Sequence, residues 1–180
     1  MSNNWNKNDD VFCSAEIWNS RNTPISKPSN LGHDESKIVG HINKVWGLNN
    51  EGDVISDNTT TRLLPELFHL ACGSVIYTAY SSDKLVNQTN ELIAEIESGE
   101  KFVSMECIFS DFSYAVGSNG DYQIIERNDT SAFLSKHLRA YGGEGKYKGK
   151  TIGRLLKNIT FVGKGYVDKP ANPESIILSS

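Results

Sequence analysis

The chain has 180 residues, a net charge of −4 and 38% hydrophobic residues, which suits one domain with a sizeable core. The acidic balance excludes a general basic footprint for nucleic acid, and no apolar run approaches the ~20 residues that cross a bilayer. Three widely spaced cysteines without a Cys-x-x-Cys pair argue against a disulfide framework or a zinc site. We therefore expect no cofactor, no metal, no membrane partner and no direct contact with nucleic acid.

The first part of the chain predicts two strands separated by a loop. Residues 1–10 are polar and rich in asparagine, which predicts a disordered N-terminus. A first strand is expected over residues 11–18, and residues 19–32 form a loop punctuated by prolines and a glycine. Alternating apolar residues then predict a strong strand over residues 37–48.

The middle of the chain contains a segment that looks like an insertion, followed by the clearest helix. Residues 53–73 are predicted to be this insertion, with a short helix that has Pro65 in its first turn and ends at Gly73. A surface excursion is the default interpretation, and a lid or a contact to scaffold is the functional alternative. A strand follows over residues 74–80, and helical spacing of apolar residues predicts a helix that ends at Gly99.

The last part of the chain returns to strands. Asn119-Gly120 between two alternating runs predicts a β-hairpin. A helix is expected from Asp129 or Thr130 to Gly142, and one or two strands over residues 151–167. The whole pattern predicts one β-rich α+β domain over residues 11–175, built as a partly closed β-barrel surrounded by helices, with residues 176–180 as the C-terminal end.

Residues 102–109 form a predicted strand with two unexpected polar side chains. Alternation places Ser104 and Glu106 on the same face, where a hydroxyl and a carboxylate need partners if the face is half-buried. By itself, the stretch is explained by an ordinary strand with one face toward solvent. The functional alternative is a nucleophile strand that presents Ser104 to a histidine.

The histidine that is best placed for this role is His33, which lies in a loop directly before a strand. Loops at strand ends commonly present functional groups, whereas residues in the middle of helices and strands tend to pack. A serine nucleophile needs an imidazole within hydrogen-bond reach, held by a third group. The other histidines are His41, His69 and His137.

Three runs of the sequence occur in the same order as the motifs of a known protein family. In residues 31–42 a loop histidine leads into Val39-Gly40-His41-Ile42, and in residues 96–106 a helix ends at glycine before Val103-Ser104. Residues 159–173 end with Pro170-Ala171-Asn172-Pro173. Together these runs resemble the histidine, nucleophile and closing-strand motifs of the bacteriophage prohead (capsid-maturation) serine proteases.

The resemblance implies the fold shared with the herpesvirus assemblins, a β-barrel surrounded by helices. It also implies a serine endopeptidase that acts in the host cytoplasm, inside the immature phage head, where it cleaves scaffold and capsid proteins. Ser104 would be the nucleophile and His33 the general base, with backbone N–H groups as the oxyanion hole. A homodimer or a scaffold-associated oligomer would be the working form.

The sequence departs from the family pattern in its closing strand. Val162-Gly163-Lys164-Gly165 contains no acid where related enzymes often have one. The third catalytic residue therefore stays open among several candidates, which are Glu106, Asp111, Glu126, His137 and Asp168. Glu106 itself is expected to hold His33 or Arg139, or to line the substrate pocket.

Two other functions remain open at this point. The missing acid is also compatible with a catalytically inactive relative that serves as a scaffold or core component of the prohead. A weaker alternative is a binding module that uses an aromatic surface including Trp5 and Trp18.

Overall fold

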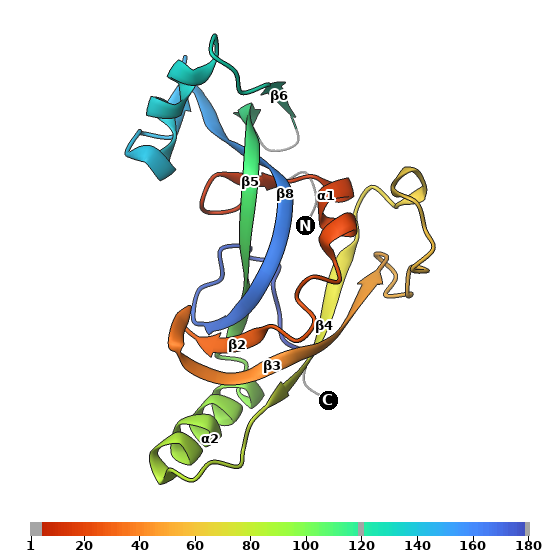
Figure 1. The fold of residues 1–180 in the computed structure, drawn as a ribbon, viewed down its shortest axis with the longest axis vertical. Helices are drawn as coiled ribbons and strands as arrows, with labels where there is room; N and C mark the ends of the chain where they lie inside the picture. The colour runs from red at the N-terminus through yellow and green to blue at the C-terminus, as the bar shows by residue number, and fades with distance from the viewer. Residues whose placement is uncertain (1–4, 119–120, 179–180) are drawn as a thin grey trace. The chain divides into compact units, whose positions relative to one another are not determined.

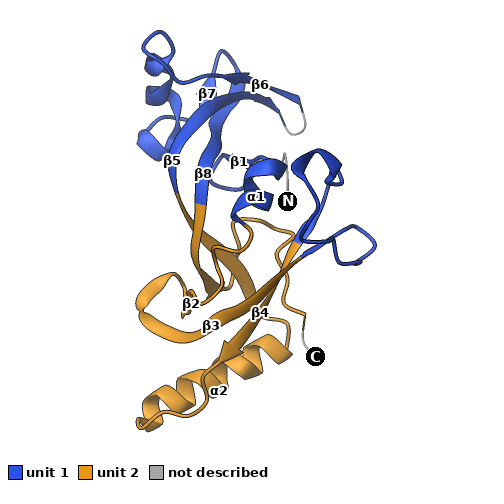
Figure 2. Ribbon diagram, turned by 45° about the vertical axis from the view of Figure 1, so that its right-hand side comes forward, with its two compact units in different colours: residues 1–20, 47–69, 109–159 blue, residues 21–46, 70–108, 160–180 orange. Residues whose placement is uncertain are grey.

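The computed structural model describes residues 5–118 and 121–178, and the chain divides into two compact units (Figure 2). Unit 1 comprises Met1–Ser20, Gly47–His69 and Phe109–Ile159. Unit 2 comprises Arg21–Trp46, Leu70–Ile108 and Thr160–Ser180. The strands β3 (Asp34–Leu48), β5 (Phe102–Ser118) and β8 (Lys150–Val167) contribute residues to both units.

The strands form one sheet in the order β4-β3-β2-β8-β5-β6, which are labelled in Figure 1. The short strands β1 and β7, labelled in Figure 2, both pair with β8. Their bounds are β1 Asp10–Phe12, β2 Pro28–Leu31, β3 Asp34–Leu48, β4 His69–Ile76, β5 Phe102–Ser118, β6 Asp121–Ile125, β7 Lys146–Tyr147 and β8 Lys150–Val167. The prediction of a β-rich protein that contains both helices and strands is confirmed, and the sheet is not a closed barrel. The hairpin of β5 and β6 is confirmed as well, although its Asn119-Gly120 turn lies outside the described residues.

Helices occupy less of the chain than the strands do. The α-helices are α1 Ser14–Ser20 and α2 Asp83–Glu97, and the 3₁₀-helices are η1 Thr61–Leu63, η2 Ala132–His137 and η3 Arg139–Tyr141. In the described part of the chain, no helix is both long and apolar enough to cross a membrane.

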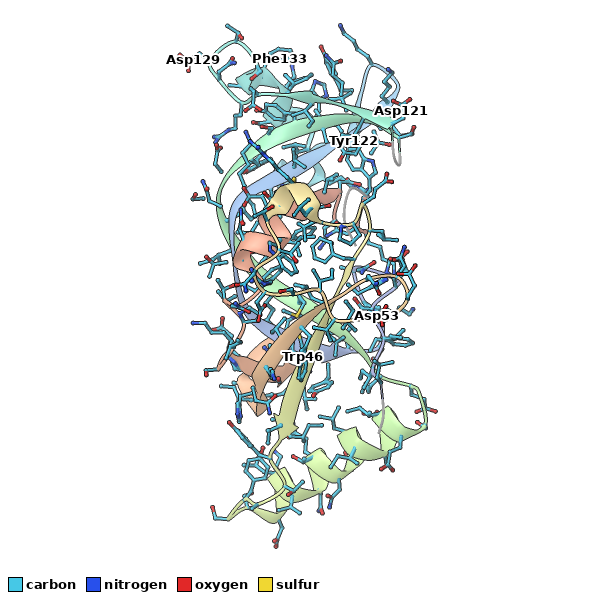
Figure 3. All side chains as sticks on the ribbon, turned by 90° about the vertical axis from the view of Figure 1, so that its right-hand side faces the viewer. Trp46, Asp53, Asp121, Tyr122, Asp129 and Phe133 are labelled. Carbon is cyan, nitrogen blue, oxygen red and sulfur yellow. The ribbon has the colours of Figure 1, made fainter. Side chains whose placement is uncertain are left out.

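Three predicted elements were wrong. Residues 11–18 are not one strand, because β1 ends at Phe12 and α1 then buries Ile17 and Trp18 on one face. The helix expected from Pro65 to Gly73 is absent: residues 69–73 begin β4, whose pairing with β3 overrides the weak local helix pattern, and the strand expected over residues 74–80 agrees with β4 as far as Ile76. Gly73 does not end a helix: a Cβ there would lie 3.1 Å from the ring of Trp46, which is labelled in Figure 3. The helix expected from residue 129 is instead η2 and η3, separated by the extended backbone of Leu138.

The segment over residues 53–73 is anchored rather than loose. Its Phe68 is buried and meets the ring of Trp18 edge-on, with 5.7 Å between the ring centroids. The indole N–H of Trp18 donates a hydrogen bond to the carbonyl of Thr59 at 2.9 Å. Within unit 1, residues 53–69 of this segment therefore pack on α1.

Residues 5–10 also differ from the disordered N-terminus that was expected, while residues 1–4 lie outside the described residues. Asp9 and Asp10 are buried, and each binds the guanidinium of one arginine, Arg139 and Arg154 respectively. Burial raises the pKa of Asp10, and the hydrogen bond from Arg154 opposes that rise. Two ion pairs thus join residues 5–10 to the rest of unit 1.

Helix α2 is the clearest agreement between sequence and structure. It buries Thr89 and Leu92, and Leu92 joins the unit 2 core with Val39 and Tyr166. Beyond its C-terminus, Gly99 has φ +76° and donates to the carbonyl of Ile96, while the N–H of Glu100 donates to Glu95. This pair of bonds is a Schellman motif, which needs a left-handed residue at Gly99.

We expect Gly99→Ala to lower the free energy of unfolding by about 1 kcal/mol, because an L side chain is strained in the left-handed region. No atom lies within 4 Å of the position of a Cβ at Gly99, so backbone strain accounts for the whole effect. Urea denaturation measures it. Ser98→Ala, at φ −79°, is the matched control and should change stability by less than about 0.5 kcal/mol. Equal losses in the two variants would contradict the prediction.

Candidate active site

His33 lies in a two-residue turn between β2 and β3. Leu31 pairs with Asp34, and the two residues between them, Gly32 and His33, have φ of 62° and 64°. Two consecutive left-handed residues are typical of a type I′ hairpin turn, and histidine is among the few non-glycine residues enriched there. The N–H of Gly32 donates to the carbonyl of Tyr166 at 2.9 Å, which ties the turn to β8. The loop expected over residues 19–32 therefore ends in a short strand and a fixed turn.

Asp34 follows His33 directly but is engaged elsewhere. Its Oδ1 accepts hydrogen bonds from the hydroxyl and the N–H of Ser36, at 2.6 and 3.0 Å, and Lys37 Nζ lies 3.0 Å from Oδ2. The Ser36 hydroxyl and the Lys37 ammonium lower the pKa of Asp34 to about 2. Asp34 thus stabilises the start of β3 and does not orient the imidazole.

The partner of His33 is Glu106, which comes from β5. The His33 Nδ1 lies 2.7 Å from Glu106 Oε1, and the side chains are 41% and 21% exposed respectively. The side-chain amide of Asn30, in β2, donates to the same Oε1 at 2.7 Å. Glu106 Oε1 therefore accepts a hydrogen bond from the buried amide of Asn30 and also contacts the imidazole of His33, which reaches solvent.

Two glycines of β8 leave the space that this pair occupies. A Cβ at Gly163 would lie 2.7 Å from Glu106 Oε2, and a Cβ at Gly165 would lie 2.9 Å from His33 Nδ1. Alternation along a strand puts Gly163 and Gly165 on the same face. The closing strand lacks an acid, but its glycines allow the acid of a neighbouring strand to contact the histidine.

This contact fixes the chemistry of the imidazole. A carboxylate oxygen accepts hydrogen bonds, so a neutral His33 bonded to it carries its proton on Nδ1. Nε2 then holds a lone pair and is able to accept a proton from another group. In serine proteases, an imidazole oriented by a carboxylate in this way acts as the general base of the catalytic triad.

Ser104 lies two residues before Glu106 on β5 and shares its face. Same-face neighbours along a strand are about 6.6 Å apart, a spacing that an imidazole bonded at one end is able to bridge. Ser104 is 8% exposed, and among the described residues no hydrogen bond joins it to His33. The structure thus brings His33 and Glu106 into contact, and Ser104 lies on β5 two residues before Glu106.

The other candidates for the third member have different partners. Asp168 accepts from Lys101 Nζ at 2.6 Å, an ion pair that lowers the pKa of Asp168, and His137 meets the ring of Tyr147 at 5.1 Å between centroids. The remaining pairs are Asp111 with Arg127, Glu126 with Lys157, and Arg139 with Asp9. Of these candidates, Glu106 is the one that contacts His33 in the described residues.

Two buried polar residues of this region, Asn30 and Lys164, were not predicted from the sequence. Asn30 is 1% exposed, yet locally it resembles any asparagine of a Pro- and Ser-rich loop. Lys164, between the two glycines, is 5% exposed, and burial lowers its pKa to about 8. Its Nζ lies 4.7 Å from the centroid of the Tyr166 ring. Alternation points Lys164 away from the His33–Glu106 face.

Comparisons with protein-family models, with curated proteins and with solved structures found no match to this chain.

Proposed function

We propose that this chain is a serine endopeptidase of the prohead-maturation type, with Ser104 as nucleophile, His33 as general base and Glu106 as the orienting acid. The observation that supports it best is the 2.7 Å contact between His33 Nδ1 and Glu106 Oε1, on the strand that carries Ser104. Its substrates are scaffold and capsid proteins inside the immature head, in the host cytoplasm. A fold relation to the prohead proteases and the herpesvirus assemblins, as a partly closed barrel surrounded by helices, belongs to the same proposal.

In this mechanism the Ser104 hydroxyl attacks the scissile carbonyl while His33 Nε2 takes its proton. Glu106 holds the ring by Nδ1–H and stabilises the imidazolium that forms. The tetrahedral intermediate collapses, His33 returns the proton to the leaving amine, and an acyl-enzyme on Ser104 Oγ remains. Water, deprotonated by the same Nε2, then attacks the acyl carbonyl; the ester bond to Ser104 Oγ breaks, and the imidazolium returns the proton to Ser104. Before substrate binds, the Ser104–His33 bond is open, as is common for catalytic hydrogen bonds in free enzymes.

Co-expression with the cognate scaffold protein tests the proposal. We expect wild-type protein to process the scaffold, and Ser104→Ala and His33→Ala to leave it uncut, because each removes a group that the acyl transfer needs. Ser110→Ala is the matched control: Ser110 is an exposed serine of the same strand, and its hydroxyl accepts from Asn158. Scaffold processing that survives in Ser104→Ala would overturn the proposal.

The burial of Ser104, and the lack of a hydrogen bond to His33 in the described residues, favours a second function. In that alternative the chain is a catalytically inactive relative and serves as a scaffold or core component of the prohead. A fluorophosphonate probe separates the two. Labelling of Ser104 in the assembled state supports the protease, and no labelling there supports the structural component.

A further inference from the structure

We propose that Asn30 is a positioning residue that locks Glu106 in the orientation in which it holds His33. This inference rests on the proposed protease function, because the role it assigns is to prepare the catalytic base. It names a residue from β2, a strand that carries neither Ser104 nor Glu106.

The geometry of Asn30 matches this role. Its Nδ2 donates to Glu106 Oε1 at 2.7 Å, the same oxygen that lies 2.7 Å from His33 Nδ1. Asn30 is 1% exposed, so its amide is held by its surroundings and cannot swing away as a surface side chain would. Two donors on one oxygen leave the carboxylate a single orientation, with Oε2 toward Gly163.

The backbone of β2 is irregular at this residue. The pairing of β2 with β3 shifts register on both sides of Asn30, between Ser29 and Asn30 and between Asn30 and Leu31. Bulges of this kind re-aim a side chain and are common near active sites. On its other edge, Asn30 pairs with Gly165, the glycine that makes room for the His33 ring.

The side-chain carbonyl of Asn30 lowers the stability of the fold. Its Oδ1 is buried and has no hydrogen-bond partner in the described part of the chain. A buried acceptor without a partner destabilises a fold, whereas an apolar side chain of similar shape would not. The amide is therefore explained better by what its N–H does for Glu106 than by its contribution to folding.

An amide suits the task because it donates a hydrogen bond without exchanging a proton. Lysine or arginine at this position would bring a charge that competes with the imidazolium for Glu106. An aspartate would place a second carboxylate against the first, and the two would share one proton. Asn30 fixes the acid and leaves the proton on the imidazole.

Asn30→Leu keeps the approximate shape and removes the donor. We expect kcat for cleavage of a scaffold-derived peptide to fall about 10- to 100-fold, the usual effect of losing a second-layer hydrogen bond. KM should stay within about twofold, because Asn30 is 1% exposed and is not accessible to substrate. The fold should persist, since Glu106 is 21% exposed and water is able to replace the lost donor. Ser29→Ala, the buried neighbour on β2, is the control and should retain wild-type kcat.

Asn30→Asp is a second variant. Its test is a change of activity with pH within one protein, so a small structural effect of the substitution does not decide the result. Its activity relative to wild type should rise as pH falls from 8 to 6, because a protonated carboxyl at this position donates to Glu106 as the amide does. Asn30→Leu has no such group and should show no relative recovery. Flat pH ratios in both variants, with kcat at the wild-type level, would overturn the inference.

A measurement without substrate separates this inference from the protease function. The ¹⁵N shifts of the His33 ring, observed through its non-exchanging protons, distinguish the Nδ1–H tautomer from the Nε2–H tautomer. We expect Nδ1–H in the wild type and in Ser29→Ala, and a mixture in Asn30→Leu. If the wild type cleaves nothing but this difference appears, the positioning role stands and the protease proposal fails. If Asn30→Leu keeps a pure Nδ1–H tautomer, the positioning role fails whatever the activity.

Discussion

Replacing Glu106 by alanine is expected to lower kcat for peptide cleavage by about 10⁴-fold, the size of effect seen when the acid of a serine-protease triad is removed. The variant loses the acceptor that lies 2.7 Å from His33 Nδ1, so the ring is free to turn and to carry its proton on Nε2. In the proposed mechanism, a proton on Nε2 blocks the atom that accepts the Ser104 proton. KM should change little, because the lost interaction grows only as the imidazolium forms.

Asp168→Ala is the matched control for this prediction. Asp168 is the other carboxylate in unit 2 that the sequence offered as third member, and it binds Lys101 at the surface. Removing it breaks an exposed ion pair, which is worth at most about 1 kcal/mol of stability. Steady-state kinetics on one scaffold-derived peptide compares the two variants. A larger loss of kcat in Asp168→Ala than in Glu106→Ala would assign the role of the acid to Asp168.

Local signals predicted the parts of the fold that depend on neighbours in sequence. Helix α2 has apolar residues at helical spacing and a glycine at its end, and both features survive in the structure as the buried Leu92 and the left-handed Gly99. The first half of β4 could not be predicted in the same way. Residues 69–73 are expected at the end of a short helix, and the contact that decides their conformation is pairing with β3, about thirty residues earlier in the chain. The strand expected over residues 74–80 agrees with β4 as far as Ile76.

The candidate site likewise contains residues that local sequence predicts and contacts that depend on distant parts of the chain. The sequence predicts His33 and Ser104 as site residues because each lies in a recognisable local setting: His33 in a loop before a strand, and Ser104 as a polar residue within a strand. Asn30, Gly163 and the contact of Glu106 with His33 depend on β2, β5 and β8 lying side by side. No spacing within a single sequence encodes that adjacency, so Glu106 was one candidate among five.

Replacing Lys164 by methionine is expected to raise the free energy of unfolding by about 2 kcal/mol at pH 7. Burial lowers the pKa of Lys164 from 10.5 to about 8, a difference of about 2.5 units. That difference corresponds to about 3 kcal/mol of penalty on the charged form. The attraction of the ammonium to the Tyr166 ring, 4.7 Å away, offsets about 1 kcal/mol of it. Methionine has a similar length and fills the same space without a charge.

The stability that Lys164→Met gains over the wild type should decrease as pH rises above about 8. Between about pH 8 and 10.5 the folded protein has released the Lys164 proton and the unfolded chain still holds it, so the wild type gains stability as pH rises. Below about pH 8 both states are protonated, and the wild type bears the whole penalty. The advantage of Lys164→Met should therefore be full at pH 7 and shrink toward pH 10.5.

Urea denaturation at pH 7, 9 and 10 measures this advantage. Lys150→Met, an exposed lysine of the same strand, is the matched control and should shift stability by less than about 0.5 kcal/mol at each pH. A Lys164→Met protein that is less stable than wild type at pH 7 would show that the ammonium has a favourable partner. An advantage that stays constant with pH would mean that it comes from packing and not from the buried charge.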